Sequence, residues 1–60
     1  MKKYNVIFKV YDADGHSRND SVEVEAGNKK AAYNRALSEI SKRTELSGKY
    51  KKIVQIEEVA

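Results

Sequence analysis

The residue types best suited to chemistry lie in one polar stretch, Asp12 to Asp20, with the sequence DADGHSRND. A calcium loop of the EF-hand type needs alternating oxygen ligands, a glycine after the third of them, and a closing glutamate. Here His16 takes the third ligand position, Gly15 comes before it, and Glu23, at the closing position, falls within a predicted strand. The stretch instead predicts the turn of a β-hairpin, with Gly15 at positive φ and the aspartates bonded to nearby backbone.

His16 is the only histidine in the chain and could act as a general base. Catalysis also requires an oriented partner and a pocket, and Asp14 or Asp20 of the same stretch could approach the imidazole as that partner. The sequence has no glycine-rich phosphate loop and no nucleophile with an adjacent base. We therefore expect a non-enzymatic protein without a metal or another cofactor, and we interpret His16 as a solvated turn residue.

Composition narrows the class of protein further. The chain has 60 residues, with twelve basic and nine acidic side chains and a formal net charge of +3. This length predicts a single small domain over residues 1–60. The absence of cysteine excludes disulfides and thiolate metal sites and favours a cytoplasmic location. No apolar run is long enough to span a membrane, and the mild positive charge permits an acidic partner without requiring one.

Two alternating segments flank the polar stretch and predict paired strands. In residues 3–11 one face is apolar and the other is mixed, which is typical of a half-buried strand. Val22 and Val24 alternate with polar residues in the second segment, so we expect the two segments to form an antiparallel hairpin. The apolar face of the first strand consists of Tyr4, Val6, Phe8 and Val10.

A helix is expected next, from about Lys29 to Leu46. Asn28 is a suitable N-cap and Gly48 a suitable left-handed stop. The outer face of this helix would carry a row of charged residues at i, i+4 spacing, and its inner face the apolar residues. The outer row is Arg35, Glu39 and Arg43, and the inner set is Ala32, Tyr33, Ala36, Leu37, Ile40 and Thr44.

The segment YKKIVQIEEV then predicts a third strand, which gives an α+β fold of order ββαβ. The first strand is the most apolar, so we place it at the centre of an antiparallel sheet of order 2-1-3, with the helix on one face. Compatible cross-strand pairs favour a register in which Val6 lies opposite Val54. The further pairs are Tyr4 with Ile56 and Val10 with Tyr50 on the helix side, and Ile7 with Ile53, Lys3 with Glu57, Asn5 with Gln55 and Lys9 with Lys51 on the open side.

The open face of this sheet is the first candidate binding surface. Lysines around an aromatic side chain suit phosphates and stacked bases, so we predict contact with nucleic acid. The alternative is that these lysines only keep the face soluble and deter edge pairing. The candidate residues are Lys3, Lys9, Tyr11, Lys49 and Lys51, with Lys52 as a possible extension.

A protein partner is the second hypothesis. Ile7 and Ile53 would form an apolar spot on the same face, and both outer strands would expose unpaired backbone. Such a surface suits a protein-interaction or inhibitor module, or a homodimer of the chain itself.

Overall fold

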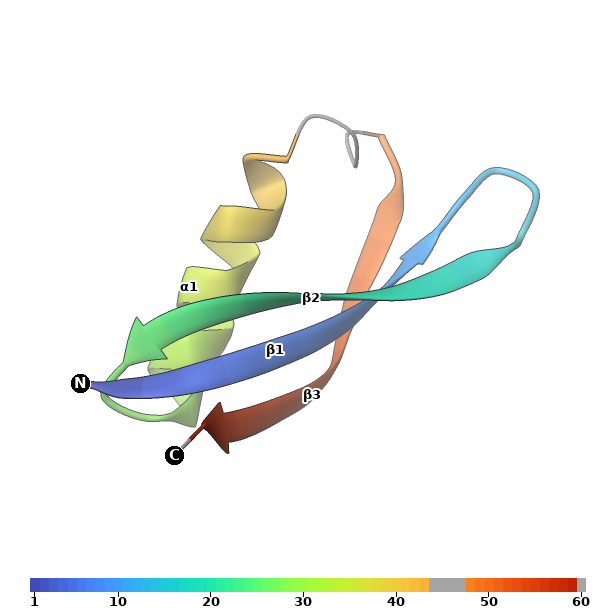
Figure 1. Ribbon diagram of the computed structural model, residues 1–60. Helices are drawn as coiled ribbons and strands as arrows, with labels where there is room; N and C mark the ends of the chain where they lie inside the picture. Colours follow the sequence, from blue (N-terminus) through green and yellow to red (C-terminus); the bar gives the residue numbers. More distant parts are fainter. Residues whose placement is uncertain (44–47, 60) are drawn as a thin grey trace.

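The computed structural model describes residues 1–43 and 48–59. The elements in chain order are β1 (Lys2–Tyr11), β2 (Ser17–Ala26), α1 (Lys29–Ser41) and β3 (Tyr50–Val59). The strands form an antiparallel sheet in the order β2-β1-β3, and α1 covers one face of it (Figure 1). The predicted ββαβ fold with its 2-1-3 sheet is therefore confirmed.

The core forms where the apolar face of β1 meets the helix. Tyr4, Val6, Phe8 and Val10 are each at most 2% exposed, whereas Ile7 on the opposite face is only half-buried. Tyr4 and Val6 pack with buried residues of β2 and α1, and Phe8 and Val10 pack with Ile40. The even-numbered side chains of β1 thus face the helix, as the alternation predicts, and its odd-numbered side chains form the open face.

Helix α1 begins as predicted but ends early. The Asn28 side chain accepts a hydrogen bond from the Ala31 N–H at 2.9 Å, so Asn28 is the N-cap. The helix ends at Ser41, whose hydroxyl donates to the Ser38 carbonyl at 2.8 Å. A hydrogen bond from a serine hydroxyl to a backbone carbonyl of the preceding turn competes with the backbone hydrogen bonds that would continue the helix. The predicted inner residue Thr44 and the predicted end at Leu46 lie outside the described residues, and Gly48, with φ of 79°, belongs to the connection to β3.

The helix covers the sheet unevenly. Its contacts are mainly with β2, and among the described members of the predicted inner set only Ala32, Ala36 and Ile40 are buried. Tyr33 and Leu37, which the helical projection places on the inner face, are 43% and 44% exposed and are not part of the core. The buried stripe of α1 is narrow, and it consists mostly of alanines, whose short side chains cover little of the sheet. As a result the helix-facing side of β3 is only partly covered.

The predicted register of β3 is also wrong. Val6 lies opposite Ile56 rather than Val54, and Phe8 lies opposite Ile53, because an irregularity between Ile7 and Phe8 leaves an extra residue in β3. That residue, Val54, is 46% exposed. A β-bulge of this kind shifts the alternation by one residue. The side chains of residues 50–53, which precede the bulge, therefore lie on the faces opposite to those predicted.

The molecule is elongated, with extents of 38 × 18 × 14 Å. The β1–β2 hairpin extends past the end of α1, so both of its faces are uncovered near the turn (Figure 1). Over the described part of the chain, no helix has the length and apolar character needed to cross a membrane.

Candidate functional site

The tip of the hairpin is a hydrogen-bonded turn, as predicted. The Gly15 N–H donates to the Asp12 carbonyl at 3.1 Å, and Gly15 has φ of 84°. The Asp12 N–H donates to the His16 carbonyl at 3.0 Å and closes the loop. A turn followed by a glycine in the left-handed region is a common three-residue hairpin connection.

The turn also brings together the candidate cation ligands. Possible ligand atoms of Asp12, Asp14 and His16 lie within 4.8 Å of one another, and all three residues are exposed. The Asp12 side chain, however, accepts hydrogen bonds from the Asp14 N–H at 3.1 Å and the His16 N–H at 3.0 Å. This hydrogen bonding is typical of an aspartate that stabilises a turn, and the turn alone accounts for the cluster.

The open sheet face carries three of the predicted nucleic-acid residues. Lys3, Lys9 and Tyr11 are odd-numbered residues of β1, so they lie on the side away from α1. Lys9 and Tyr11 are neighbours along this face. Lys3 lies near the other end of the strand, about 20 Å from Lys9 at the usual strand rise. Lys49 is exposed and immediately precedes β3, which places it at the hairpin end of the sheet.

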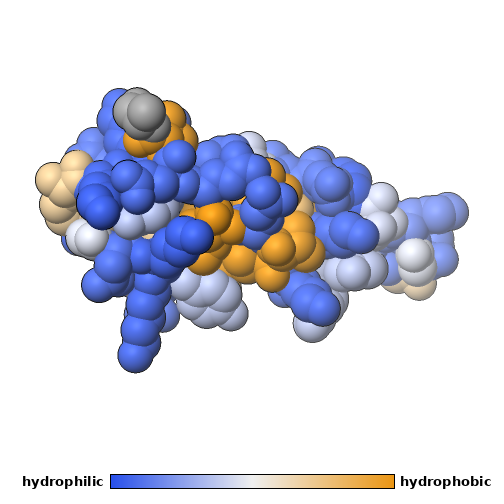
Figure 2. Space-filling model, turned by 90° about the horizontal axis from the view of Figure 1, so that it is seen from below, coloured by the Kyte–Doolittle hydropathy of each residue, from blue (hydrophilic) through white to orange (hydrophobic). Residues whose placement is uncertain are grey.

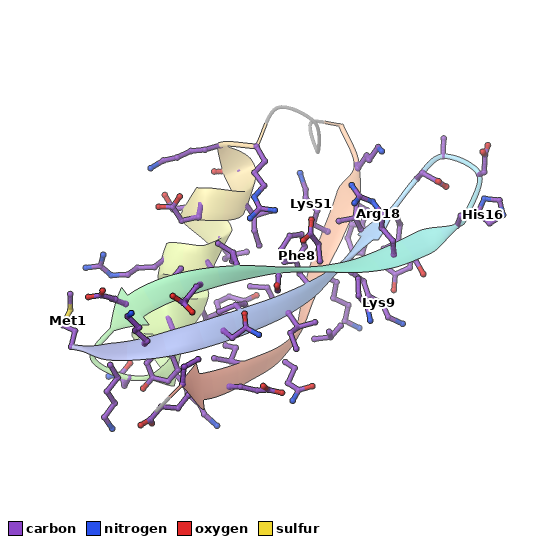
Figure 3. The ribbon with its side chains drawn as sticks, viewed as in Figure 1. Met1, Phe8, Lys9, His16, Arg18 and Lys51 are labelled. Carbon is purple, nitrogen blue, oxygen red and sulfur yellow. The ribbon has the colours of Figure 1, made fainter. Side chains whose placement is uncertain are left out.

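Lys51 does not belong to this face, contrary to the prediction. It lies opposite Val10, whose side chain is buried under the helix, and it lines a groove with Leu37 and Ile40. Figure 3 shows Lys51 and Lys9 on opposite sides of the sheet. The bulge at Val54 is the physical reason, because the predicted register assumed unbroken alternation along β3.

Lys52 and Tyr50 occupy the open face in its place. Lys52 lies opposite Lys9, and Tyr50 lies opposite Tyr11. The two tyrosine rings are 5.5 Å apart between centroids and inclined by 46°, which is a favourable aromatic arrangement. The sequence pattern predicts Tyr50 on the helix side and Lys52 only as a possible extension of the site, so these two placements were missed. The adjacent residues Lys51 and Lys52 could have indicated this outcome, because an alternating strand places one of two consecutive lysines on each face.

Charge is unevenly distributed along the open face. Lys9 and Lys52 are directly opposed like charges, and in residues 1–43 and 48–59 no ion pair joins either of them to a carboxylate. The acidic residues of this face lie toward the chain termini, where Glu23 and Glu57 flank Asn5. The hairpin end of the face is therefore basic and aromatic. We call the residues Lys9, Tyr11, Tyr50 and Lys52 the basic–aromatic cluster.

The predicted apolar spot of Ile7 and Ile53 does not form. Ile53 lies opposite Phe8 and packs against both parts of the core, while Ile7 remains on the open face. The exposed apolar surface lies instead between α1 and β3. There a groove of about 180 Å³ is lined by Leu37, Ile40, Ser41, Lys51 and Ile53. Figure 2, which views the molecule from below Figure 1, shows an apolar area flanked by hydrophilic surface.

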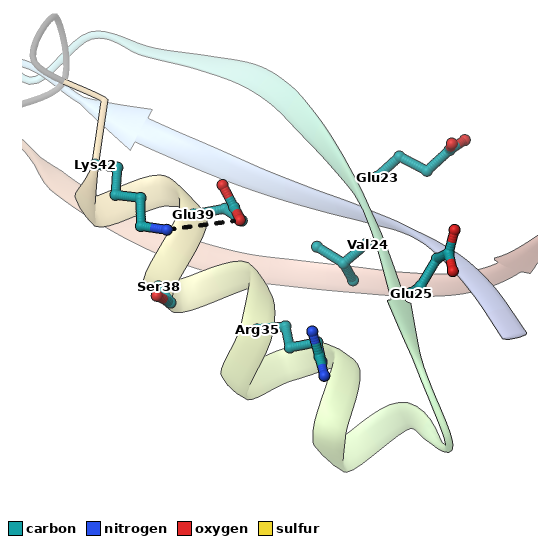
Figure 4. A pocket seen from close by; sticks show the side chains of 7 residues that line it. All are labelled: Glu23, Val24, Glu25, Arg35, Ser38, Glu39 and Lys42. Atoms are coloured by element: carbon teal, nitrogen blue, oxygen red, sulfur yellow. Dashed lines mark ion pairs between the residues drawn. The ribbon is translucent and has the colours of Figure 1, made fainter. Parts of the chain in front are cut away.

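A second depression, of about 340 Å³, lies between α1 and β2 (Figure 4). Its walls carry both signs of charge, and Lys42 Nζ lies 3.9 Å from Glu39 Oε1 across one turn of the helix end. Glu23 and Glu25 come from β2, Arg35 and Glu39 come from α1, and Lys42 follows the end of α1, so both elements carry charges into the depression. The lining residues are Glu23, Val24, Glu25, Arg35, Ser38, Glu39 and Lys42.

The chain matches no known family model, and it has no significant similarity to any curated protein or solved structure.

Proposed function

We propose that this protein is a non-enzymatic, cytoplasmic binding module that contacts single-stranded nucleic acid through the basic–aromatic cluster. The observation that carries the proposal is the opposition of Lys9 and Lys52 beside the Tyr11–Tyr50 ring pair. The combination of lysines and tyrosines favours a nucleic acid, because the cations bind phosphates and the exposed rings stack on bases of any sequence.

The lysine pair supports an anionic ligand. Directly opposed like charges destabilise a strand pair, and an anion between the two ammonium groups relieves this repulsion. A phosphate on a nucleic acid also releases condensed counterions when a lysine neutralises it, which adds to the affinity. A phosphate bound between Lys9 and Lys52 would therefore be stabilised by both ammonium groups.

The tyrosine pair supports a nucleic acid over a simple anion. Tyr50 is 66% exposed, so one ring face is accessible to a base. The rings lie two residues along the strands from the lysines, about 7 Å at the usual strand rise. A stacked strand covers this distance with about two nucleotides. Stacking contributes about 1–3 kcal/mol per base and needs no particular sequence.

Binding of a fluorescently labelled oligothymidine, measured by fluorescence anisotropy at low salt, tests the proposal. We expect micromolar affinity that falls with salt, with a log–log slope of about −1.4 for two phosphates neutralised on a single strand. Lys9→Glu with Lys52→Glu should weaken binding at least tenfold. The matched control is Lys29→Glu with Lys30→Glu, which changes the net charge equally at the exposed start of α1.

The stacking component needs its own pair of variants. Tyr50→Ala should weaken binding several-fold, whereas Tyr33→Ala, which removes a 43% exposed tyrosine from α1, should not. The proposal is wrong if the wild-type protein shows no binding at low salt. It is equally wrong if the lysine control reduces affinity as much as the Lys9 and Lys52 variant does, since binding would then follow net charge alone.

A further inference from the structure

The outer edge of β3 is unpaired within the sheet, and its sequence is complementary to itself. We propose that a second copy of this chain pairs antiparallel with β3, which joins two sheets into one continuous sheet with both helices on the same side. The proposed pairing does not depend on nucleic-acid binding, although Lys52 belongs both to the basic–aromatic cluster and to the paired edge.

The bulge is what makes the two faces agree. Before Val54, Ile53 faces the helix and Lys52 faces the open side; after it, Ile56 faces the helix and Glu57 the open side. A two-fold axis between Val54 and Gln55 therefore places Ile53 opposite Ile56 on the helix side. It also places Lys52 opposite Glu57 on the open side. In a strand without a bulge, the same axis would oppose residues from different faces.

Charge complementarity selects this register. The first half of β3 carries Lys51 and Lys52, and the second half carries Glu57 and Glu58. Antiparallel self-pairing about the centre brings each basic residue opposite an acidic one, which stabilises a strand pair. Lys51 and Glu58 already interact within their own chain, Glu58 with Lys2 at 3.7 Å. The charge complementarity of the edge therefore depends on Lys52 and Glu57, of which Glu57 also accepts a hydrogen bond from Gln55.

The edge of β2 offers no such match. The strand β2 has three acidic residues, Asp20, Glu23 and Glu25, but only one basic residue, Arg18. The Arg18 guanidinium already lies 4.0 Å from Asp20 within the chain. Self-pairing of β2 would leave most of its charges without an opposite partner. The two edges of the sheet thus differ, and β3 is the edge suited to a second copy.

Apolar burial points the same way. The groove between α1 and β3 opens beside the unpaired edge, where Leu37 and Val54 are 44% and 46% exposed. The two-fold axis brings the grooves of both copies to the same side of the joined sheet, next to each other. Bulges often deter edge pairing by twisting a strand away; here the bulge aligns Ile53 with Ile56 of the second copy and so favours pairing.

A charge-exchange experiment tests the proposal. Sedimentation equilibrium of the wild-type protein, from low micromolar to near-millimolar concentration, should show a monomer–dimer equilibrium. The variants Lys51→Glu with Lys52→Glu and Glu57→Lys with Glu58→Lys should each be folded by circular dichroism, with dimerisation weakened at least tenfold. An equimolar mixture of the two variants should recover dimers, because each strand then meets opposite charges. Lys29→Glu with Lys30→Glu is the control and should dimerise as the wild type does.

Hydrogen exchange identifies the surface involved. Amides of β3 should become more protected as the protein concentration rises, while those of the β2 edge should not. The proposal fails if the wild type stays monomeric at the highest concentration or if the mixed variants remain monomers. It also fails if the concentration-dependent protection appears at β2 instead of β3.

Discussion

At the residue scale, Arg43 links the helix end to the sheet, although the helical projection predicts it on the exposed outer face. It lies just beyond α1, and its guanidinium contacts Asp20 Oδ2 and the Ser21 carbonyl, each at 3.3 Å. The same guanidinium lies 5.8 Å from the centre of the Phe8 ring, within the range of a cation–π interaction. Arg43 thus connects the end of the helix to β2 and covers the largest fully buried side chain of the core.

We expect Arg43→Ala to lower the free energy of unfolding by about 1 kcal/mol, since it removes a half-exposed ion pair and apolar packing together. Arg43→Lys should recover less than half of this loss, because an ammonium cannot reach two acceptors in a fork geometry. Urea denaturation monitored by circular dichroism measures both effects. Arg35→Ala is the matched control on the exposed face of α1, and an equal loss there would contradict the assigned role.

The sequence predicts a single exposed row of Arg35, Glu39 and Arg43, and only the first two lie within the helix. The prediction for Arg43 fails because the helix stops at Ser41, so the chain direction changes before that side chain. Where the local pattern is regular, as in β1 from Tyr4 to Val10, the alternation predicts every buried side chain correctly. Residue roles are thus predictable inside elements and less so just past their ends.

At the scale of elements, α1 depends strongly on its first turn. It spans 13 residues, too short for stability in isolation, and its buried face consists mainly of two alanines and Ile40. The Asn28 cap satisfies a backbone N–H that would otherwise lack a partner within the helix. The residue Asn28 therefore contributes more to this helix than a cap does to one with a broad apolar face.

Asn28→Ala should lower the free energy of unfolding by about 1 kcal/mol. Asn34→Ala makes the same chemical change at an exposed position inside the helix, where alanine has the higher helix propensity, and should raise it by up to about 0.5 kcal/mol. Thermal unfolding of the two variants checks the opposite signs. Equal destabilisation by both changes would show that the Asn28 side chain does not act as a cap.

The bulge of β3 explains why the candidate site was only partly predictable. The alternation of β1 correctly places Lys9 and Tyr11 on the open face, since that strand is regular. In β3 the residues Ile53, Val54 and Ile56 offer apolar side chains in either phase, so the sequence alone does not locate the extra residue. The structure places it at Val54, which exchanges Lys51 for Lys52 at the basic–aromatic cluster.

At the scale of the whole molecule, the size of the core limits stability. A chain of 60 residues buries about 60% of the surface that its unfolded form exposes, which is less than a larger domain buries, and domains of this size often gain stability from self-association. The groove beside β3 leaves part of the apolar surface of this chain uncovered. Pairing through β3 would bury that surface and would couple the folding of each copy to the presence of the other.

Coupling of this kind makes the thermal unfolding midpoint depend on protein concentration. Each tenfold increase in concentration stabilises a dimer relative to two unfolded chains by about 1.4 kcal/mol. For two chains of this length, that corresponds to a rise of roughly 5 °C in the midpoint. Scanning calorimetry over two decades of concentration should show this rise for the wild type and a much smaller one for the Glu57→Lys, Glu58→Lys variant. Superimposable wild-type curves at all concentrations would mean that the folded monomer is stable without pairing through β3.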